Sequence, residues 1–289
     1  MTDHIDHMGP GTRFSPARAA ADAHVAPRGA SSTMLNKVPE VFLLFWVVKI
    51  LSTTVGETAA DYLSGTLGFG MTLTSLIMSG FLVLALAAQF RARRYVPGIY
   101  WLTVVLVSVV GTLISDNLVD KLGVSLWTTT VIFSVGLAVT FAVWFRSERT
   151  LSIHTIVTSR REGFYWLAIL LTFALGTSAG DLVSEGLALG YGTALGIFGA
   201  LIGLVTLAFW KGGLNAVLAF WTAYVLTRPL GASLGDLLTQ APADGGFGLG
   251  TNATSGLFLA VILGGVGWFT LQQRRGDQAP QLAEPAGAA

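Results

Sequence analysis

Long apolar stretches separated by short polar connections follow one another along most of the chain. A helix that crosses a bilayer needs about 20 predominantly apolar residues, and the sequence contains eight such stretches. They cover approximately residues 39–63, 70–90, 97–119, 125–145, 163–186, 191–210, 214–239 and 254–272. This pattern predicts an all-α, polytopic membrane protein with eight transmembrane helices. The polar segments 1–36 and 273–289 are expected to be disordered tails.

The composition supports this class and excludes several others. The chain has 289 residues, of which 53% are hydrophobic and 11% charged, against roughly a quarter charged in an ordinary soluble domain. A formal charge of +1 gives no strong field for nucleic acid, and the absence of cysteine excludes disulfides and thiolate sites. All four histidines lie outside the apolar stretches. Intramembrane chemistry therefore depends on carboxylates, hydroxyls and two cations, and we expect no cofactor.

Basic residues are distributed unequally over the connections. Lys and Arg collect in cytoplasmic loops, and the tails and the loops after the even-numbered spans hold nearly all of the 17 present. Only Lys121 lies in a connection on the other face, while Lys49 and Arg228 fall inside spans. The distribution predicts that both termini are cytoplasmic.

Four segments of the chain align with one another without a gap. Each segment begins with an aromatic residue followed by a tryptophan, and the four tryptophans are Trp46, Trp101, Trp166 and Trp221. Ten residues after each Trp comes a glycine: Gly56, Gly111, Gly176 and Gly231. Fifteen residues after each Trp comes an aspartate: Asp61, Asp116, Asp181 and Asp236. Each repeat covers two spans, so the copies cross in the same sense, and we predict four parallel tandem helical hairpins. Residues 37–149 hold repeats 1 and 2, residues 150–162 form a cytoplasmic linker, and residues 163–272 hold repeats 3 and 4.

This repeat resembles that of a known family. The segment KVPEV followed by FWVVKILSTTVGETAADYLS, together with the fourfold Trp, is similar to the bacterial integral membrane proteins built from four tandem copies of a repeat of unknown function, number 347 in its series. The resemblance covers about residues 36–272. It implies a multi-pass protein of the bacterial cytoplasmic membrane. It implies little about function, and transport is the role usually considered for such proteins.

The repeated glycines are expected to be architectural. Each is followed four positions later by a small residue, namely Ala60, Ser115, Gly180 or Gly235. Such small-xxx-small pairs let helices in a membrane approach closely.

The repeated aspartates are the main candidates for function. Each lies toward the outer end of an odd-numbered span, where a carboxylate opposes the helix dipole. Three of them belong to acidic pairs spaced by four residues, which share one helix face; the pairs are Glu57 with Asp61, Asp116 with Asp120, and Asp181 with Glu185. Carboxylate and hydroxyl oxygens suit hard divalent cations or protons. We therefore predict an ion-binding set of Glu57, Asp61, Asp116, Asp181, Asp236 and Arg228, with a metal held by the four aspartates.

Two basic residues within spans need partners. Lys49 is expected to extend toward the cytoplasmic side. Arg228 lies deeper and precedes Pro229, and alignment of the repeats places it near the depth of Glu57, so a buried Arg228–Glu57 pair is predicted. An Arg that binds an anionic substrate is the rival interpretation.

These features favour a secondary transporter or permeation pathway for a divalent metal ion or a proton-coupled cation. The alternative is a non-catalytic scaffold in which the acids pair structurally or bind a partner protein. An enzyme is not expected, because no His or Cys accompanies the hydroxyls at membrane depth. The predicted partners are the lipid bilayer and a small cation or proton, without nucleic acid.

Overall fold

The computed structural model describes residues 36–282, and within this range it contains eight long α-helices and no β-strand. The helices are α2 (Leu43–Asp61), α3 (Gly70–Arg91), α4 (Pro97–Asp116), α5 (Leu126–Glu148), α6 (Ser159–Asp181), α7 (Tyr191–Gly212), α8 (Ala216–Thr239) and α9 (Thr251–Leu282). Each predicted apolar stretch coincides with one of them. The all-α prediction is therefore confirmed for the described residues, and residues 1–35 and 283–289 of the predicted tails lie outside them.

Seven of the eight helices in this range are long and apolar enough to cross a membrane. The exception is α8, which contains Arg228, Pro229 and Asp236. The helix lies against α2, α6 and α7, so protein rather than lipid surrounds much of its polar side. The chain is thus a multi-pass membrane protein by the length and composition of these helices.

Two boundaries differ from the prediction. The helix α9 continues to Leu282, ten residues beyond the predicted span. The linker expected at 150–162 contains a single 3₁₀ turn at Ile153–Thr155, and α6 begins within it at Ser159, capped by the Thr158 hydroxyl.

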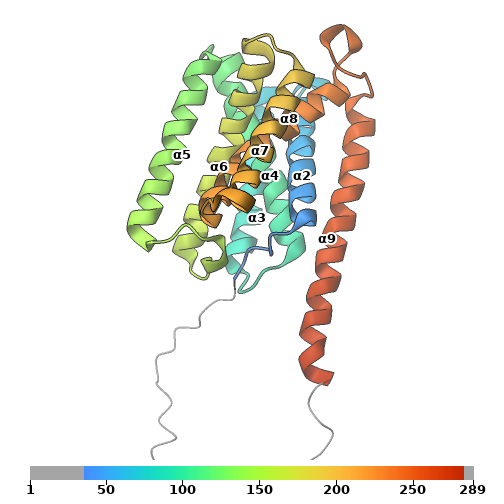
Figure 1. Cartoon of the computed structure of the whole chain (residues 1–289). Coiled ribbons are helices and arrows are strands. Elements are labelled where there is room, and N and C mark those ends of the chain that lie inside the picture. Colours follow the sequence, from blue (N-terminus) through green and yellow to red (C-terminus); the bar gives the residue numbers. More distant parts are fainter. Residues whose placement is uncertain (1–35, 283–289) are drawn as a thin grey trace, which may run out of the picture. The chain divides into compact units, whose positions relative to one another are not determined.

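The first helices of the four repeats form an inner ring. Within the described residues, α2 packs against α4 and α8, and α6 packs against the same two helices. In the apolar windows of α2, α4 and α6, between 61 and 67% of the residues are buried, compared with 11 to 22% in α3, α5, α7 and α9. The inner ring is therefore α2, α4, α6 and α8, and the other four helices lie outside it, with α5 and α9 on opposite sides in Figure 1.

The outer helices interlock the repeats. The principal inner-helix partner of α3 is α4, that of α5 is α6, and that of α7 is α8. The last outer helix, α9, packs against α2 at the start of the chain. Each repeat therefore covers the inner helix of the next repeat, and the fourth covers the first.

The repeated glycines are the points of closest approach in the inner ring. A Cβ atom added to any of them would lie only 2.0 to 2.7 Å from a side chain of a neighbouring inner helix; the side chains are Ser108 for Gly56, Phe173 for Gly111, Arg228 for Gly176 and Thr53 for Gly231. The inner helices pass through these glycines without a break. The small-residue prediction is confirmed, and the aspartates stay near the helix ends.

The inner helices of repeats 1 to 3 end alike. Each α-helix ends at its repeated aspartate and continues as one π-helical turn, at Tyr62–Thr66, Asn117–Lys121 or Leu182–Gly186. In repeat 4, α8 runs three residues past Asp236 to Thr239 and is followed by a 3₁₀ turn at Pro242–Asp244. The fourth repeat therefore differs at this end.

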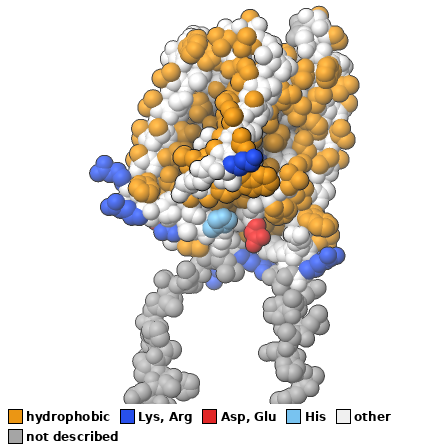
Figure 2. Space-filling model, in the orientation of Figure 1, with side chains coloured by type: hydrophobic (Ala, Val, Ile, Leu, Met, Phe, Trp, Pro, Cys, Tyr) orange, Lys and Arg blue, Asp and Glu red, His pale blue; other side chains and the backbone are white. Residues whose placement is uncertain are grey.

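Apolar side chains cover much of the helical surface. Figure 2 shows hydrophobic side chains over the helices and most of the visible Lys and Arg side chains gathered toward one end. Large exposed residues such as Leu76, Val83, Trp127 and Trp210 belong to the outer helices. A soluble monomer rarely exposes so much contiguous apolar surface. In a membrane, lipid chains would cover this surface.

Candidate functional site: a polar axis in the inner ring

Side chains at equivalent repeat positions meet at successive levels inside the ring. An aromatic level lies near the start of the inner helices and contains Phe45, Tyr100, Tyr165 and Phe220. Members on neighbouring inner helices contact one another: the hydroxyls of Tyr100 on α4 and Tyr165 on α6 are 2.5 Å apart, and the ring centres of Phe45 on α2 and Phe220 on α8 are 6.3 Å apart. This level closes one end of the inner ring with aromatic side chains.

Arg228 and Glu57 form a buried ion pair deeper in the ring. The guanidinium of Arg228 on α8 contacts the Glu57 carboxylate on α2, and neither side chain is more than 9% exposed. The same Nη2 atom contacts the Thr112 hydroxyl on α4 and donates to the Thr177 hydroxyl on α6 at 2.7 Å. The predicted Arg228–Glu57 pair is confirmed, and its network reaches all four inner helices.

The hydrogen-bonding capacity of Arg228 is not exhausted by this network. Its Nε and Nη1 atoms are buried and have no hydrogen-bond partner in the part of the chain that the structure describes. The ring of Phe173 lies 5.5 Å from the guanidinium carbon, a distance at which a cation and a π face attract one another. The site therefore has spare donors next to the ion pair.

Lys49 does not extend to the cytoplasmic side, and that prediction is wrong. The side chain is buried, and its ammonium donates to the Tyr224 carbonyl oxygen at 2.9 Å and to the Thr227 hydroxyl. It also lies 4.3 Å from the centre of the Tyr224 ring. Extension was expected because Lys49 is close to the start of its helix, but α8 supplies oxygen acceptors and an aromatic face directly opposite.

Lys49, Arg228, Glu57, Thr112 and Thr177 together form a line of polar side chains, which we call the polar axis. Thr112 and Thr177 were not among the predicted site residues. They occupy the same repeat position as Glu57, so the alignment contained the signal that places them beside the carboxylate.

The four aspartates surround the far end of the inner ring. Neighbouring carboxylates repel one another around the ring: Asp61 with Asp116, Asp116 with Asp181, Asp181 with Asp236, and Asp236 with Asp61. Each also interacts electrostatically with Glu57. Asp61 is exposed and the other three are half-buried. The structure thus brings the predicted acids to one end of the polar axis.

The four aspartates were predicted to hold a metal ion. Among residues 36–282, no group of three or more His, Asp or Glu side chains is placed to hold a metal ion. The aspartates lie on four separate helices, α2, α4, α6 and α8. The metal site at Asp61, Asp116, Asp181 and Asp236 therefore stays a prediction.

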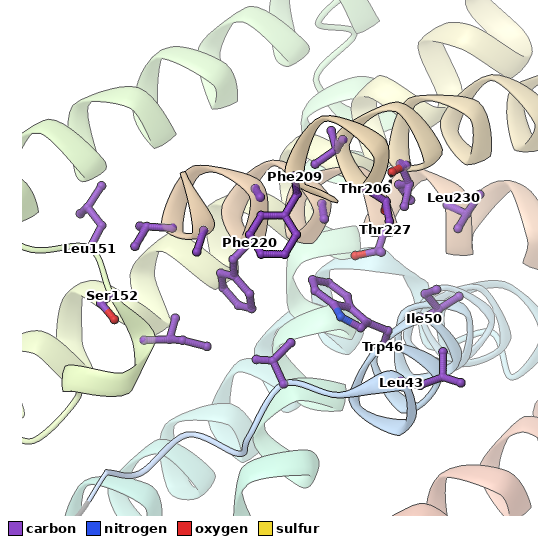
Figure 3. A pocket seen from close by; sticks show the side chains of 18 of the residues that line it. Leu43, Trp46, Ile50, Leu151, Ser152, Thr206, Phe209, Phe220, Thr227 and Leu230 are labelled. Carbon is purple, nitrogen blue, oxygen red and sulfur yellow. Dashed lines mark hydrogen bonds between the residues drawn. The ribbon is translucent and has the colours of Figure 1, made fainter. Parts of the chain in front are cut away.

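A cavity of about 800 Å³ lies beside the polar axis, between α2, α7 and α8. Figure 3 shows Trp46 and Ile50 of α2, Phe209 of α7, and Phe220 and Thr227 of α8 on its lining. The lining is mainly apolar, and Thr227 is the residue whose hydroxyl accepts a hydrogen bond from Lys49. The cavity and the polar axis are therefore separated by one threonine side chain.

Comparisons with known proteins identify the repeat. No curated protein and no solved structure matches the chain. A family model described as Repeat of Unknown Function (DUF347) matches four consecutive segments, residues 44–95, 99–150, 164–212 and 219–275. Each match covers one inner helix and the outer helix that follows it. The chain belongs to the family of proteins built from this repeat.

Proposed function

We propose that this protein is a secondary transporter for a small cation, driven by or exchanging with protons, and that the polar axis is its pathway. The observation that carries the proposal is the Arg228–Glu57 pair, buried between four helices that also bear a ring of carboxylates at one end. Ionisable residues inside a membrane are costly and commonly mark ion or proton pathways.

The two ends of the pathway differ in character. Carboxylates at the far end attract cations from water, whereas the aromatic level at Phe45, Tyr100, Tyr165 and Phe220 narrows the other end. Movement of a cation past Glu57 requires the carboxylate to exchange Arg228 for the ion or for a proton. The halves formed by repeats 1 and 2 and by repeats 3 and 4 would then move relative to one another.

The proposal includes a topology. All eight helices cross the bacterial cytoplasmic membrane, α8 among them, with both termini and the arginine-rich connections in the cytoplasm. The carboxylate ring then faces the outside. The tandem hairpins are parallel, and the outer helices contact lipid.

Transport is tested with the full-length protein reconstituted in vesicles that contain a pH-sensitive dye. We expect an imposed cation gradient to drive proton movement, and Glu57→Gln to abolish it in the protein that still folds, although the unpaired Arg228 lowers stability. Glu40→Gln, which changes an exposed carboxylate outside the helices, is the matched control. Normal flux through both Glu57→Gln and the Asp116→Asn/Asp181→Asn double variant would contradict the proposal.

A scaffold is the second candidate, and one observation favours it. The Arg228 network joins all four inner helices, as a structural clamp would. In that case no ion should move through the wild-type protein. We propose no catalytic activity for the polar axis.

A further inference from the structure

The ammonium of Lys49 has the surroundings of an organic-cation site. A carbonyl oxygen, a hydroxyl and two aromatic rings face it, the centres of the Tyr224 and Phe173 rings being 4.3 and 5.3 Å away. Neutral oxygens and aromatic faces are the groups that recognise ammonium ligands. No carboxylate lies within ion-pair distance of Lys49 among the residues described. The ammonium group of Lys49 therefore lies where the positive charge of an organic cation could bind.

The charges around Lys49 determine what else can bind. Arg228 on α8 faces Lys49. Arg228 is already paired with Glu57, which lies on α2, the same helix as Lys49. Tyr224, also on α8, faces the ammonium with its ring, His154 lines the cavity, and α9 carries no ionisable residue between 251 and 273. The Lys49 charge therefore has no ion-pair partner among the residues described. A second cation can bind beside it only when Lys49 loses its proton, because like charges repel strongly where water is excluded.

The cavity provides space for such a ligand. Its volume of about 800 Å³ falls in the range of small-molecule sites. Trp46, Phe209 and Phe220 line it, and Thr227 connects it with Lys49. Two of its lining residues, Leu43 and Phe209, are also exposed on the apolar surface. An ion with an apolar body can therefore reach it from the bilayer.

We infer that the cavity binds an organic ammonium ion with apolar substituents, and that its binding releases one proton from Lys49. The ion places its positive charge against Thr227 and the rings of Trp46 and Phe220 in the cavity lining, and the proton leaves the Lys49 ammonium for water. The total charge of the ring stays constant during this exchange. The inference rests on the proposed transport function and specifies both its substrate class and its coupling.

The test uses the purified full-length protein and tetrapropylammonium, a permanently charged ion that has no proton of its own. Calorimetric titration at pH 6.5, 7.5 and 8.5, in buffers of different ionisation enthalpy, measures affinity and proton release together. We expect one proton to be released per ion bound, and an affinity that rises about tenfold per pH unit while Lys49 is charged, since one pKa unit corresponds to tenfold in binding.

Three variants sharpen this result. Lys49→Met should bind the ion without proton release and without pH dependence. Thr227→Val should bind at least tenfold more weakly. Lys211→Met, which removes an exposed lysine at the end of α7, should behave like the wild type. Thermal midpoints measured alongside identify any variant that fails to fold.

Several results would overturn the inference. One is the absence of binding by a protein that still transports protons or inorganic cations, which would leave the proposed function intact. Another is binding without proton release, or pH dependence that persists in Lys49→Met. Equal binding of a neutral alcohol such as octanol, without proton release, would identify the cavity as a groove for lipid chains.

Discussion

Repeats 1 and 4 differ from repeats 2 and 3 where the inner helices meet. Side chains at three equivalent levels point into the ring in every repeat. In repeats 2 and 3 they are uncharged: Val104, Ser108, Thr112, Ile169, Phe173 and Thr177. In repeats 1 and 4 they include all three charges of the polar axis: Lys49, Glu57 and Arg228.

The charged repeats are also the ones that meet where the ring closes. The helices α2 and α8 come from opposite ends of the described chain and contact one another, and the 800 Å³ cavity lies beside their interface. The comparison indicates that the shared residues build the ring and that departures from the repeat carry its chemistry. The predictions below test this division, from the largest expected effect to the smallest.

Replacing Arg228 should have the largest effect on stability. Arg228→Met leaves the Glu57 carboxylate buried without its partner, and breaking a buried ion pair in this way costs about 3–5 kcal/mol. Unfolding in detergent should show this loss. The Arg228→Met/Glu57→Gln double variant should regain most of it, because no unpaired charge remains. A double variant that is as unstable as the single variant would show that the pair is needed for packing rather than for charge balance.

Adding a methyl group at the repeated glycines should destabilise every interface of the ring similarly. In Gly231→Ala the new Cβ would lie 2.7 Å from Thr53 Cγ2 and 3.0 Å from the Ile50 carbonyl oxygen, and such overpacking costs about 1–3 kcal/mol. Gly111→Ala should cost a similar amount at the α4–α6 interface. In the control Gly203→Ala on α7, nothing lies within 4 Å of the added atom, so stability should rise slightly through helix propensity. Thermal midpoints that fall only for Gly231→Ala would limit the close packing to the α2–α8 interface.

Thr112 tests whether an uncharged repeat supports the charged ones. Its hydroxyl donates to Glu57 at 3.0 Å, and loss of such a bond in Thr112→Val should cost about 1 kcal/mol. Thr270→Val removes a hydroxyl that bonds only to its own helix backbone and is the matched control. The effect of Thr112→Val should become smaller in an Arg228→Met/Glu57→Gln background, which removes both charged partners of the hydroxyl. An undiminished effect there would show that the hydroxyl does not support the ion pair.

The smallest effect is expected at the carboxylate ring, and it should be stabilising. Asp116 is the last residue of α4 and repels Asp61 and Asp181. In Asp116→Asn the charge that opposes the helix dipole disappears, which should raise stability by about 0.3–1 kcal/mol. A lower thermal midpoint would mean that Asp116 is paired structurally, as the scaffold interpretation requires.

The sequence was sufficient to predict where the helices lie along the chain and which residues occupy equivalent positions in the four repeats. Hydrophobic stretches placed all eight helices, and the fourfold alignment identified the glycines that pack closely. The depth of Arg228 and Glu57 along their helices was sufficient to predict their pairing. These features depend on spacing along the chain, which the sequence records directly.

Features that depend on which helices are neighbours were not predictable in the same way. A repeated hairpin does not reveal whether its second helix packs on its own partner or on the next repeat, because the apolar faces are alike in every copy. For the same reason the opposing groups of Lys49, which come from α8, could not be recognised from its own segment.

Because the repeats interlock in a closed ring, the arrangement of the helices in space does not depend on which hairpin comes first along the chain. Every outer helix covers the inner helix of the following repeat, and α9 covers α2. Each junction between repeats therefore has the same kind of contact, an outer helix packed on an inner one. A circularly permuted chain that begins with α4 and ends with α3, with the ends of α9 and α2 joined by a linker, would keep every one of these contacts. During synthesis of the natural chain, by contrast, α2 lacks its outer cover until the final helix emerges, so the first repeat made is the last to be completed.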